Sequence, residues 1–216
     1  TNNTSAMLMT VEGDEQAIGY VSLGSLNEKV KAVKVEDVEA TAENVSNGTY
    51  KIARPFNIAF KADGQSDLSK DFIAYIMSEE GQTIINEHGY VGSNDAAAYE
   101  GNGAEGKLVV GGSSSVSPVM EKLIEAYKAV NPKADIELQT TDSTTGMTAA
   151  IDGTYDIGMA SRELKDDEAA ALSHQAIAMD GIAVIVNQAN PTDELSVEQI
   201  GSIFTGELTK WNEIVK

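Results

Sequence analysis

Strands and helices alternate along the second half of this chain, and this alternation restricts the possible fold more than any other feature. A strand-like run at Lys107–Val110 leads to a helix from Pro118 to Val130, with Ser117 as its cap and Pro132 after its end. Further strand and helix pairs are expected at 135–139 and 145–152, at 155–159 and 165–173, and at 177–186 followed by a helix capped by Ser196. Such alternation predicts an α/β fold on a largely parallel sheet.

The first ninety residues carry shorter elements. Strand-like runs cover 17–22 and 29–35. A longer extended run from Tyr50 to Phe60 contains Pro55, which predicts a sheet edge or a crossover, because proline cannot donate to a strand ladder. Apolar residues between Leu68 and Met77 recur at helical spacing and predict a helix that faces a core.

Composition changes sharply between these two parts of the chain. The run from Gly92 to Gly106 is small, polar and acidic, which is typical of a linker. We therefore predict one part at 1–91, a linker at 92–106 and a second part at 107–216.

Charge and cysteine content exclude several classes of protein. The 216 residues carry a formal charge of −19, which argues against nucleic acid as a partner, because its phosphates need a basic surface. There are no cysteines, so neither disulfides nor thiolate metal sites can form. No run reaches the roughly 20 apolar residues of a membrane span, and Thr1–Thr4 lacks the basic and apolar regions of a signal peptide. We predict no metal and no cofactor.

Three junctions between a strand and a helix are rich in hydroxyl groups and glycine. They lie at Gly111–Pro118, Thr141–Gly146 and Ala160–Arg162. Glycine lets a backbone approach a ligand, and the amides at a helix N-terminus favour anions. Because the carboxyl ends of parallel strands meet at one edge of a sheet, we expect the junctions to enclose one tetrahedral oxyanion, with Arg162 as a fork-shaped donor.

Simpler interpretations exist for each feature. Serine, threonine and glycine are also ordinary helix caps. Catalysis has little support, because the chain has two histidines and neither a Gly-x-Ser-x-Gly elbow nor a Gly-Lys-Ser/Thr phosphate loop, so we predict no enzyme. The acidic group Asp166, Asp167 and Glu168 is interpreted as a solvated helix face.

Several motifs together resemble the phosphate-binding proteins of bacterial ABC phosphate transporters. The runs that resemble the N-terminal half of that family are 107–118, 142–147, 156–165, 180–183 and 203–211. The runs 17–22 and 79–82 look like its C-terminal half. The resemblance covers nearly all of the chain.

The resemblance implies a two-lobed clamshell of the periplasmic-binding-protein-like type II fold, with 50–60 and 177–186 as crossovers between lobes. It implies capture of inorganic phosphate without catalysis, and a transporter permease as partner. The phosphate contacts carried over by matching motifs are Ser114, Ser115, Thr144, Thr145, Ser161 and Arg162. Asp180 is either a further phosphate contact that accepts a proton or a turn residue. The implied location is extracellular or periplasmic, with any lipoprotein anchor outside this segment.

The order of the two halves is reversed relative to the family. Either a circular permutation or a fragment of a tandem protein explains this order, and the linker-like run 92–106 favours the tandem fragment. In both cases the family's middle segment with its Gly-Ser-Gly-Thr-Arg loop is missing, so the second lobe is expected to be truncated. Two alternatives stay open: a receptor for sulfate, molybdate or tungstate, and a surface sensing module with a vestigial pocket.

Overall fold

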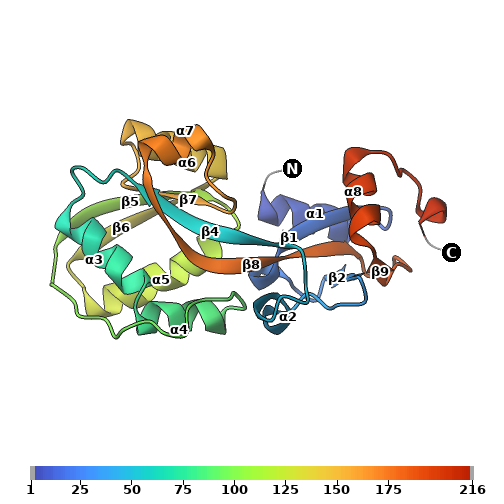
Figure 1. Cartoon of the computed structure of the whole chain (residues 1–216), viewed down its shortest axis with the longest axis horizontal. Helices are drawn as coiled ribbons and strands as arrows, with labels where there is room; N and C mark the ends of the chain where they lie inside the picture. The colour runs from blue at the N-terminus through green and yellow to red at the C-terminus, as the bar shows by residue number, and fades with distance from the viewer. Residues whose placement is uncertain (1–2, 215–216) are drawn as a thin grey trace. The chain divides into compact units, whose positions relative to one another are not determined.

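A computed structural model describes residues 3–214 and divides the chain into two compact units (Figure 1). Unit 1 contains residues 1–53 and 181–216, and unit 2 contains 54–180. The chain passes between the units twice, between Ala53 and Arg54 inside strand β4 and between Asp180 and Gly181 inside strand β8. Both passages fall within the runs that the resemblance implied as crossovers.

Unit 2 holds most of the regular structure. Its elements, with the two strands that it shares with unit 1, are β4 (Ala53–Phe60), α3 (Asp67–Ile76), α4 (Glu79–Glu87), β5 (Gly106–Ser113), α5 (Ser117–Val130), β6 (Ala134–Thr141), α6 (Ser143–Asp152), β7 (Ile157–Ala160), α7 (Asp166–Ala171) and β8 (Ser173–Asn187).

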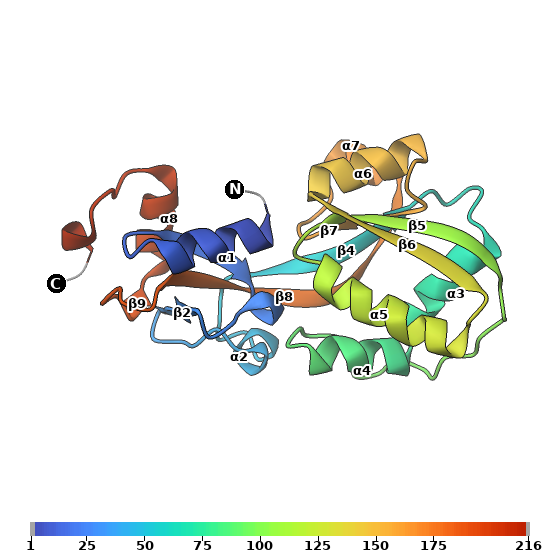
Figure 2. The same cartoon turned by 180° about the vertical axis from the view of Figure 1, so that it is seen from behind.

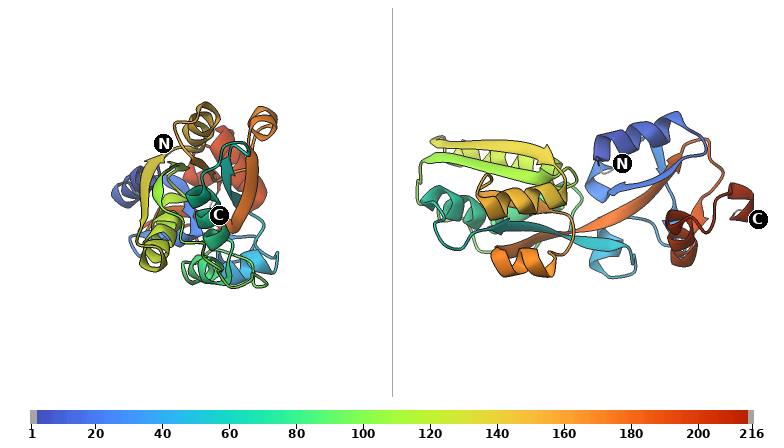
Figure 3. Two further views of the ribbon diagram at one scale, coloured as in Figure 1. Left: turned by 90° about the vertical axis from the view of Figure 1, so that its left-hand side faces the viewer. Right: turned by 90° about the horizontal axis from the view of Figure 1, so that it is seen from above.

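The sheet of unit 2 is mixed rather than largely parallel. Strand β5 lies between β6 and β7 and is parallel to both, whereas β4 runs antiparallel to β7 and lies between β7 and β8. Helices α3, α4 and α5 cover one face of this sheet, and α6 and α7 cover the other (Figures 2 and 3). The prediction of a parallel sheet was therefore correct only for β6, β5 and β7.

The main core of unit 2 explains the apolar stripes of the sequence. Fully buried Phe72, Leu123 and Tyr127 from α3 and α5 pack with Leu108 and Val110 of β5. Helix α5 covers the predicted span, but it begins at Ser117 itself, and the cap is Val116. On the other sheet face, small residues such as Ala59 and Ala160 let α6 pack closely.

Unit 1 contains the first and last parts of the chain. Its elements, apart from the shared strands, are α1 (Thr4–Gly13), β1 (Ile18–Ser22), η1 (Leu23–Ser25), β2 (Val30–Ala32), β3 (Lys34–Val35), α2 (Ala42–Ser46), β9 (Glu194–Leu195), α8 (Val197–Thr205) and η2 (Trp211–Glu213). Strands β1 and β2 both pair antiparallel with β8, and β3 pairs in parallel with β9. Helices α1 and α2 had no counterpart among the elements predicted from sequence.

The linker-like run from Gly92 to Gly106 lies within unit 2 and is tied to its helices. The buried carboxylate of Asp71 in α3 accepts hydrogen bonds from the Tyr99 hydroxyl at 2.6 Å and the Asn102 amide at 3.2 Å. The Tyr127 hydroxyl of α5 donates to the same carboxylate at 2.6 Å. The run is therefore held against α3 and α5, and the predicted division at 92–106 differs from the division between compact units.

Candidate functional site

The first hydroxyl-rich turn joins the end of β5 to the start of α5. Ser113 is buried, and its hydroxyl oxygen accepts a hydrogen bond from the Ser115 amide at 3.2 Å. Its carbonyl accepts from the Val116 amide at 3.1 Å and from the Ser117 hydroxyl at 3.2 Å. Ser113 thus closes the turn that presents half-buried Ser114 and Ser115 at the N-terminus of a 14-residue helix.

Two glycines bring the second turn against the first. Gly112 has a φ of +138°, and a Cβ there would lie 2.3 Å from the carbonyl oxygen of Met159. A Cβ at Gly146 would lie 2.7 Å from the Cα of Gly112. Because neither position has room for a side chain, the first turn of α6 rests directly on the ends of β5 and β7.

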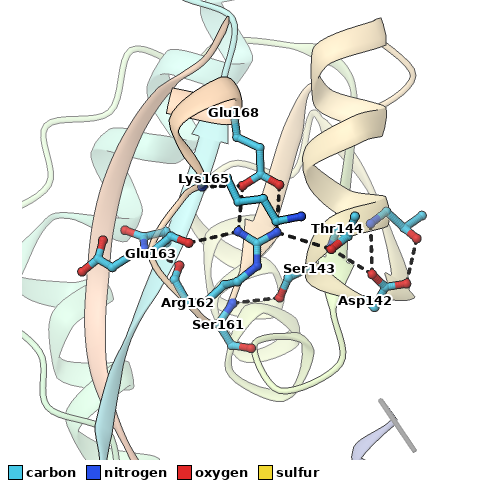
Figure 4. Close-up of polar contacts among 10 residues, drawn as sticks. Asp142, Ser143, Thr144, Ser161, Arg162, Glu163, Lys165 and Glu168 are labelled. Atoms are coloured by element: carbon cyan, nitrogen blue, oxygen red, sulfur yellow. Dashed lines mark hydrogen bonds and ion pairs between the residues drawn. The ribbon is translucent and has the colours of Figure 1, made fainter. Parts of the chain in front are cut away.

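Two short hydrogen-bond relays join all three turns. The Ser115 amide donates to Ser113, whose hydroxyl donates to the Ser161 hydroxyl at 3.0 Å. The Ser161 amide donates to the Ser143 hydroxyl at 3.1 Å (Figure 4). A hydroxyl that accepts one bond keeps its own hydrogen, so Ser161 and Ser143 are left as neighbouring donors at the ends of the relays.

Sequence reasoning did not identify Ser113 and Ser143 as members of this cluster. Both residues lie in the hydroxyl-rich junctions, directly before Ser114 and Thr144. The family motifs had indicated Ser114 and Thr144 as phosphate contacts and not the residues before them. The signal that could have found them is position: Ser113 is the last residue of β5 and Ser143 the first of α6.

The N-terminus of α6 already carries a carboxylate. Asp142 accepts hydrogen bonds from the Thr144 amide at 2.9 Å and the Thr145 amide at 3.0 Å, and the Thr145 hydroxyl donates to it at 2.7 Å. Chiefly the Thr145 hydroxyl and amide bonds hold the pKa of Asp142 below its ordinary value. Thr144 and Thr145 are exposed, and Asp142 uses the amides that the sequence had suggested for an anion.

The guanidinium of Arg162 is held by protein groups. Its two terminal nitrogens donate to the carboxylate of Glu168 at 2.7 and 2.8 Å (Figure 4). One of them also donates to the Glu163 carbonyl at 3.0 Å, and the other to the Thr144 hydroxyl at 3.4 Å. The fork predicted to face an oxyanion is therefore engaged by Glu168.

The interpretation of Asp166, Asp167 and Glu168 as a solvated face was wrong for Glu168. The first two are exposed, whereas Glu168 is only 5% exposed. The ion pair with Arg162 lowers the pKa of Glu168 and raises the pKa of Arg162. The carboxylate is buried because its partner approaches from the turn after β7, which helix periodicity alone does not reveal.

Asp180 lies at the end of unit 2 and is fully buried. The Arg54 Nε donates to its Oδ2 at 3.1 Å, from the neighbouring strand β4. Arg54 is itself 17% exposed and lies over the ring of Phe56 at 5.8 Å from the centroid. Asp180 of β8 is thus part of an ion pair with Arg54 of β4.

The cluster suits an anion better than a metal ion. Within residues 3–214, no group of three or more histidine, aspartate or glutamate side chains is placed to hold a metal. No helix in the described part of the chain is long and apolar enough to cross a membrane. The relay donors and the N-terminus of α5 instead converge at one edge of the sheet, where a tetrahedral oxyanion could accept them.

A family model described as a PBP superfamily domain matches residues 97–215. This stretch contains all of the turns described above. The fold and the turn cluster thus define a domain of the PBP superfamily, the class of two-lobed proteins that the resemblance implied.

Known proteins narrow the class further. Phosphate-binding protein PstS 2 of Streptococcus agalactiae is 50% identical over 217 aligned positions, which take in 100% of this chain and 74% of that protein. The protein of the same name from Streptococcus pneumoniae is 42% identical over 99% of this chain and 73% of its own length. The crystal structure of the phosphate-binding protein of a phosphate ABC transporter from S. pneumoniae matches with a TM-score of 0.79 and 42% identity, over 99% of this chain and 83% of that chain. The chain belongs to the PstS-type phosphate-binding proteins of phosphate ABC transporters.

Proposed function

We propose that this chain captures inorganic phosphate, with no bond made or broken, through the turn cluster of unit 2. One observation carries the proposal: two hydrogen-bond relays end at the hydroxyls of Ser161 and Ser143, and the Ser161 backbone amide donates to the Ser143 hydroxyl at 3.1 Å. The choice of phosphate among oxyanions rests on the relatives, because both PstS 2 proteins are named for binding it.

The proposed contacts are narrower than the set carried over by motif. Ser161 and Ser143 donate hydroxyl hydrogens, and the turn of Ser114 and Ser115 supplies further polar groups at the positive end of α5. Thr144, Thr145 and Arg162 support the site through their bonds to Asp142 and Glu168, whereas Asp180 is assigned to the ion pair with Arg54. Lobe closure follows binding, in the manner of a ligand that favours one of two conformations.

The relatives support a circular permutation over a tandem fragment. A tandem protein would hold two domains, each at least as long as this chain. The chain already spans 74% of the S. agalactiae relative, so that relative has no room for a second domain. We propose that the reversed order of halves is the native order in this branch of the family, with 1–91 and 107–216 as parts of one domain.

The transporter context follows from the same relatives. We propose that the phosphate-loaded protein delivers its ligand to an ABC transporter permease on the outer side of the membrane, as an extracellular, lipoprotein or periplasmic component. The S. pneumoniae structure supports this role, because it is described as the binding protein of a phosphate ABC transporter.

Calorimetric titration of inorganic phosphate tests the site. Ser161→Ala and Ser143→Ala are each expected to weaken binding by roughly 10-fold or more, since a hydrogen bond to a charged group contributes about 1.5–3 kcal/mol. Ser173→Ala is the matched control, because this exposed serine lies in the same unit at the start of β8. Unchanged affinity in both site variants would refute the proposed contacts.

Competition by other oxyanions tests the identity of the ligand. Sulfate, molybdate and tungstate are expected to displace phosphate only at much higher concentration. If any of them binds more tightly than phosphate, that oxyanion is the ligand. If neither phosphate nor any of them binds, a surface module with a vestigial pocket is favoured.

A further inference from the structure

Glu168 is a buried carboxylate at the edge of the turn cluster. The sequence had predicted that it would lie on a solvated helix face. In the first turn of α7, it accepts both terminal nitrogens of Arg162, at 2.7 and 2.8 Å, and the Lys165 amide at 2.9 Å. Its side chain is 6% exposed, so these bonds replace most of its contact with water. Such a two-pronged geometry fixes the plane of the guanidinium.

Arg162 links three elements around the relays. Its backbone carbonyl accepts from the Asn57 side chain of β4 at 2.9 Å, and its guanidinium reaches Thr144 of α6 and Glu168 of α7. The residue directly before it is Ser161, whose hydroxyl and amide both belong to the relays. The backbone of Arg162 is therefore tied to β4 and its side chain to α6 and α7, directly beside the residue that belongs to both relays.

The charge of Arg162 is compensated within the protein. Its pKa is raised first by the hydrogen bonds to Glu168 and also by the charges of Asp142 and Asp167. Releasing the guanidinium to an anion would leave Glu168 buried without its cation, which is a costly state. The ion pair is therefore better suited to hold the turn than to exchange partners.

We infer that Glu168 is a positioning residue for anion capture: through Arg162 it fixes Ser161 against Ser143, and the anion is recognised by these hydroxyls rather than by the guanidinium. This inference rests on the proposed function of the turn cluster. The Arg162 and Glu168 side chains then act only as a pair, so that loss of either side chain weakens phosphate binding to the same extent.

The two possible roles of Arg162 predict opposite effects of Glu168→Gln. If the guanidinium bound phosphate directly, removal of the competing carboxylate would strengthen binding. If Glu168 is a positioning residue, the variant weakens phosphate binding, by about 10-fold, as outer-shell substitutions do at metal sites. Arg162→Gln is expected to weaken phosphate binding by a similar factor. The double variant is expected to bind phosphate no more weakly than either single variant.

The experiment is calorimetric titration of inorganic phosphate into the full chain, with Glu163→Gln as the control. Glu163 is an exposed carboxylate in the same turn, and its bond to Arg162 runs through its backbone carbonyl, so this variant removes equal charge and keeps the ion pair. Equal or tighter binding by Glu168→Gln, or additive losses in the double variant, would overturn the inference. If Glu168→Gln fails to fold, Glu168→Asp keeps the charge but shortens the reach, and the same loss is expected.

A second measurement does not need the ligand. Hydrogen exchange of the Ser161 amide, which donates to Ser143, is expected to be at least several-fold faster in Glu168→Gln than in Glu163→Gln. Equal protection in the two variants would overturn the positioning role. Should Ser161→Ala and Ser143→Ala both bind phosphate as tightly as the unaltered chain, the proposed contacts fail, whereas loss in Ser161→Ala with none in Glu168→Gln refutes only this inference.

Discussion

The substitution Asp180→Asn separates a structural role of this residue from a role in phosphate recognition. Asp180 has no exposed surface, and Arg54, with 17% of its side chain exposed, donates to it at 3.1 Å. Asparagine keeps an oxygen that can accept this bond but leaves the guanidinium charge without its counter-ion. We expect a loss of about 3 kcal/mol in the free energy of unfolding, the lower end of the range for a broken buried ion pair.

Thermal and urea unfolding measure this loss. For a chain of this length about 3 kcal/mol lowers the midpoint temperature by about 6–12 °C. Circular dichroism reports both units, whereas fluorescence of Trp211, the one tryptophan of the sequence, reports unit 1. Because Asp180 belongs to unit 2, the shift in circular dichroism is expected to be at least as large as the shift in fluorescence.

A double-mutant cycle with Arg54→Gln completes the test. Two residues of one ion pair are expected to show a coupling energy of at least about 1 kcal/mol, so the double variant is more stable than the sum of losses predicts. A midpoint within about 1 °C of the unaltered chain, combined with weaker phosphate binding by Asp180→Asn, would refute the structural role. That result would instead make Asp180 the acceptor of the proton of hydrogen phosphate.

Two further predictions concern other buried carboxylates. Tyr127→Phe removes the 2.6 Å bond to Asp71 and is expected to cost about 1.5–3 kcal/mol in urea unfolding, and equal stability would contradict it. The pKa of Glu168 is lowered below 4.5 by Arg162, so its contribution to stability is complete above about pH 4.5 and is lost as the pH falls through the lower folded value. The difference in midpoint temperature between the unaltered chain and Glu168→Gln should therefore shrink below pH 4.5, and a constant difference would contradict this.

Local signals in the sequence predicted the elements around the site well. Helix α5 was expected to end at Val130 because its apolar stripe and Pro132 mark that end, and the structure has the same end. The hydroxyl-rich junctions after β5 and β7 were expected at one edge of the sheet, and the bond between Ser113 and Ser161 shows that they meet there. Periodicity, caps and the rule for parallel strands were sufficient for these features.

Features that depend on distant partners could not be predicted in this way. Glu168 was interpreted as solvated because it follows two other acidic residues in the first turn of an expected helix, and its ion pair with Arg162 explains its burial. The run 92–106 has the composition of a linker, yet Tyr99 anchors it to Asp71, 28 residues earlier in the chain. In both cases the sequence shows the group, and the tertiary structure decides its partner.

The acidic composition of the chain is compatible with an anion site because the carboxylates of Asp142 and Glu168, which contact residues of the turns, are occupied by protein donors. Asp142 accepts two amides and a hydroxyl, and Glu168 and Asp180 each accept an arginine. The charge of Glu168 is compensated by Arg162 and that of Asp180 by Arg54, and in the proposed site the hydroxyls of Ser161 and Ser143 add donors without adding charge. A formal charge of −19 sets the long-range field, whereas affinity for a partly enclosed anion depends on donors within hydrogen-bond distance. In the proposed site, neutral donors supported by internal ion pairs therefore let an acidic protein hold phosphate without a basic surface.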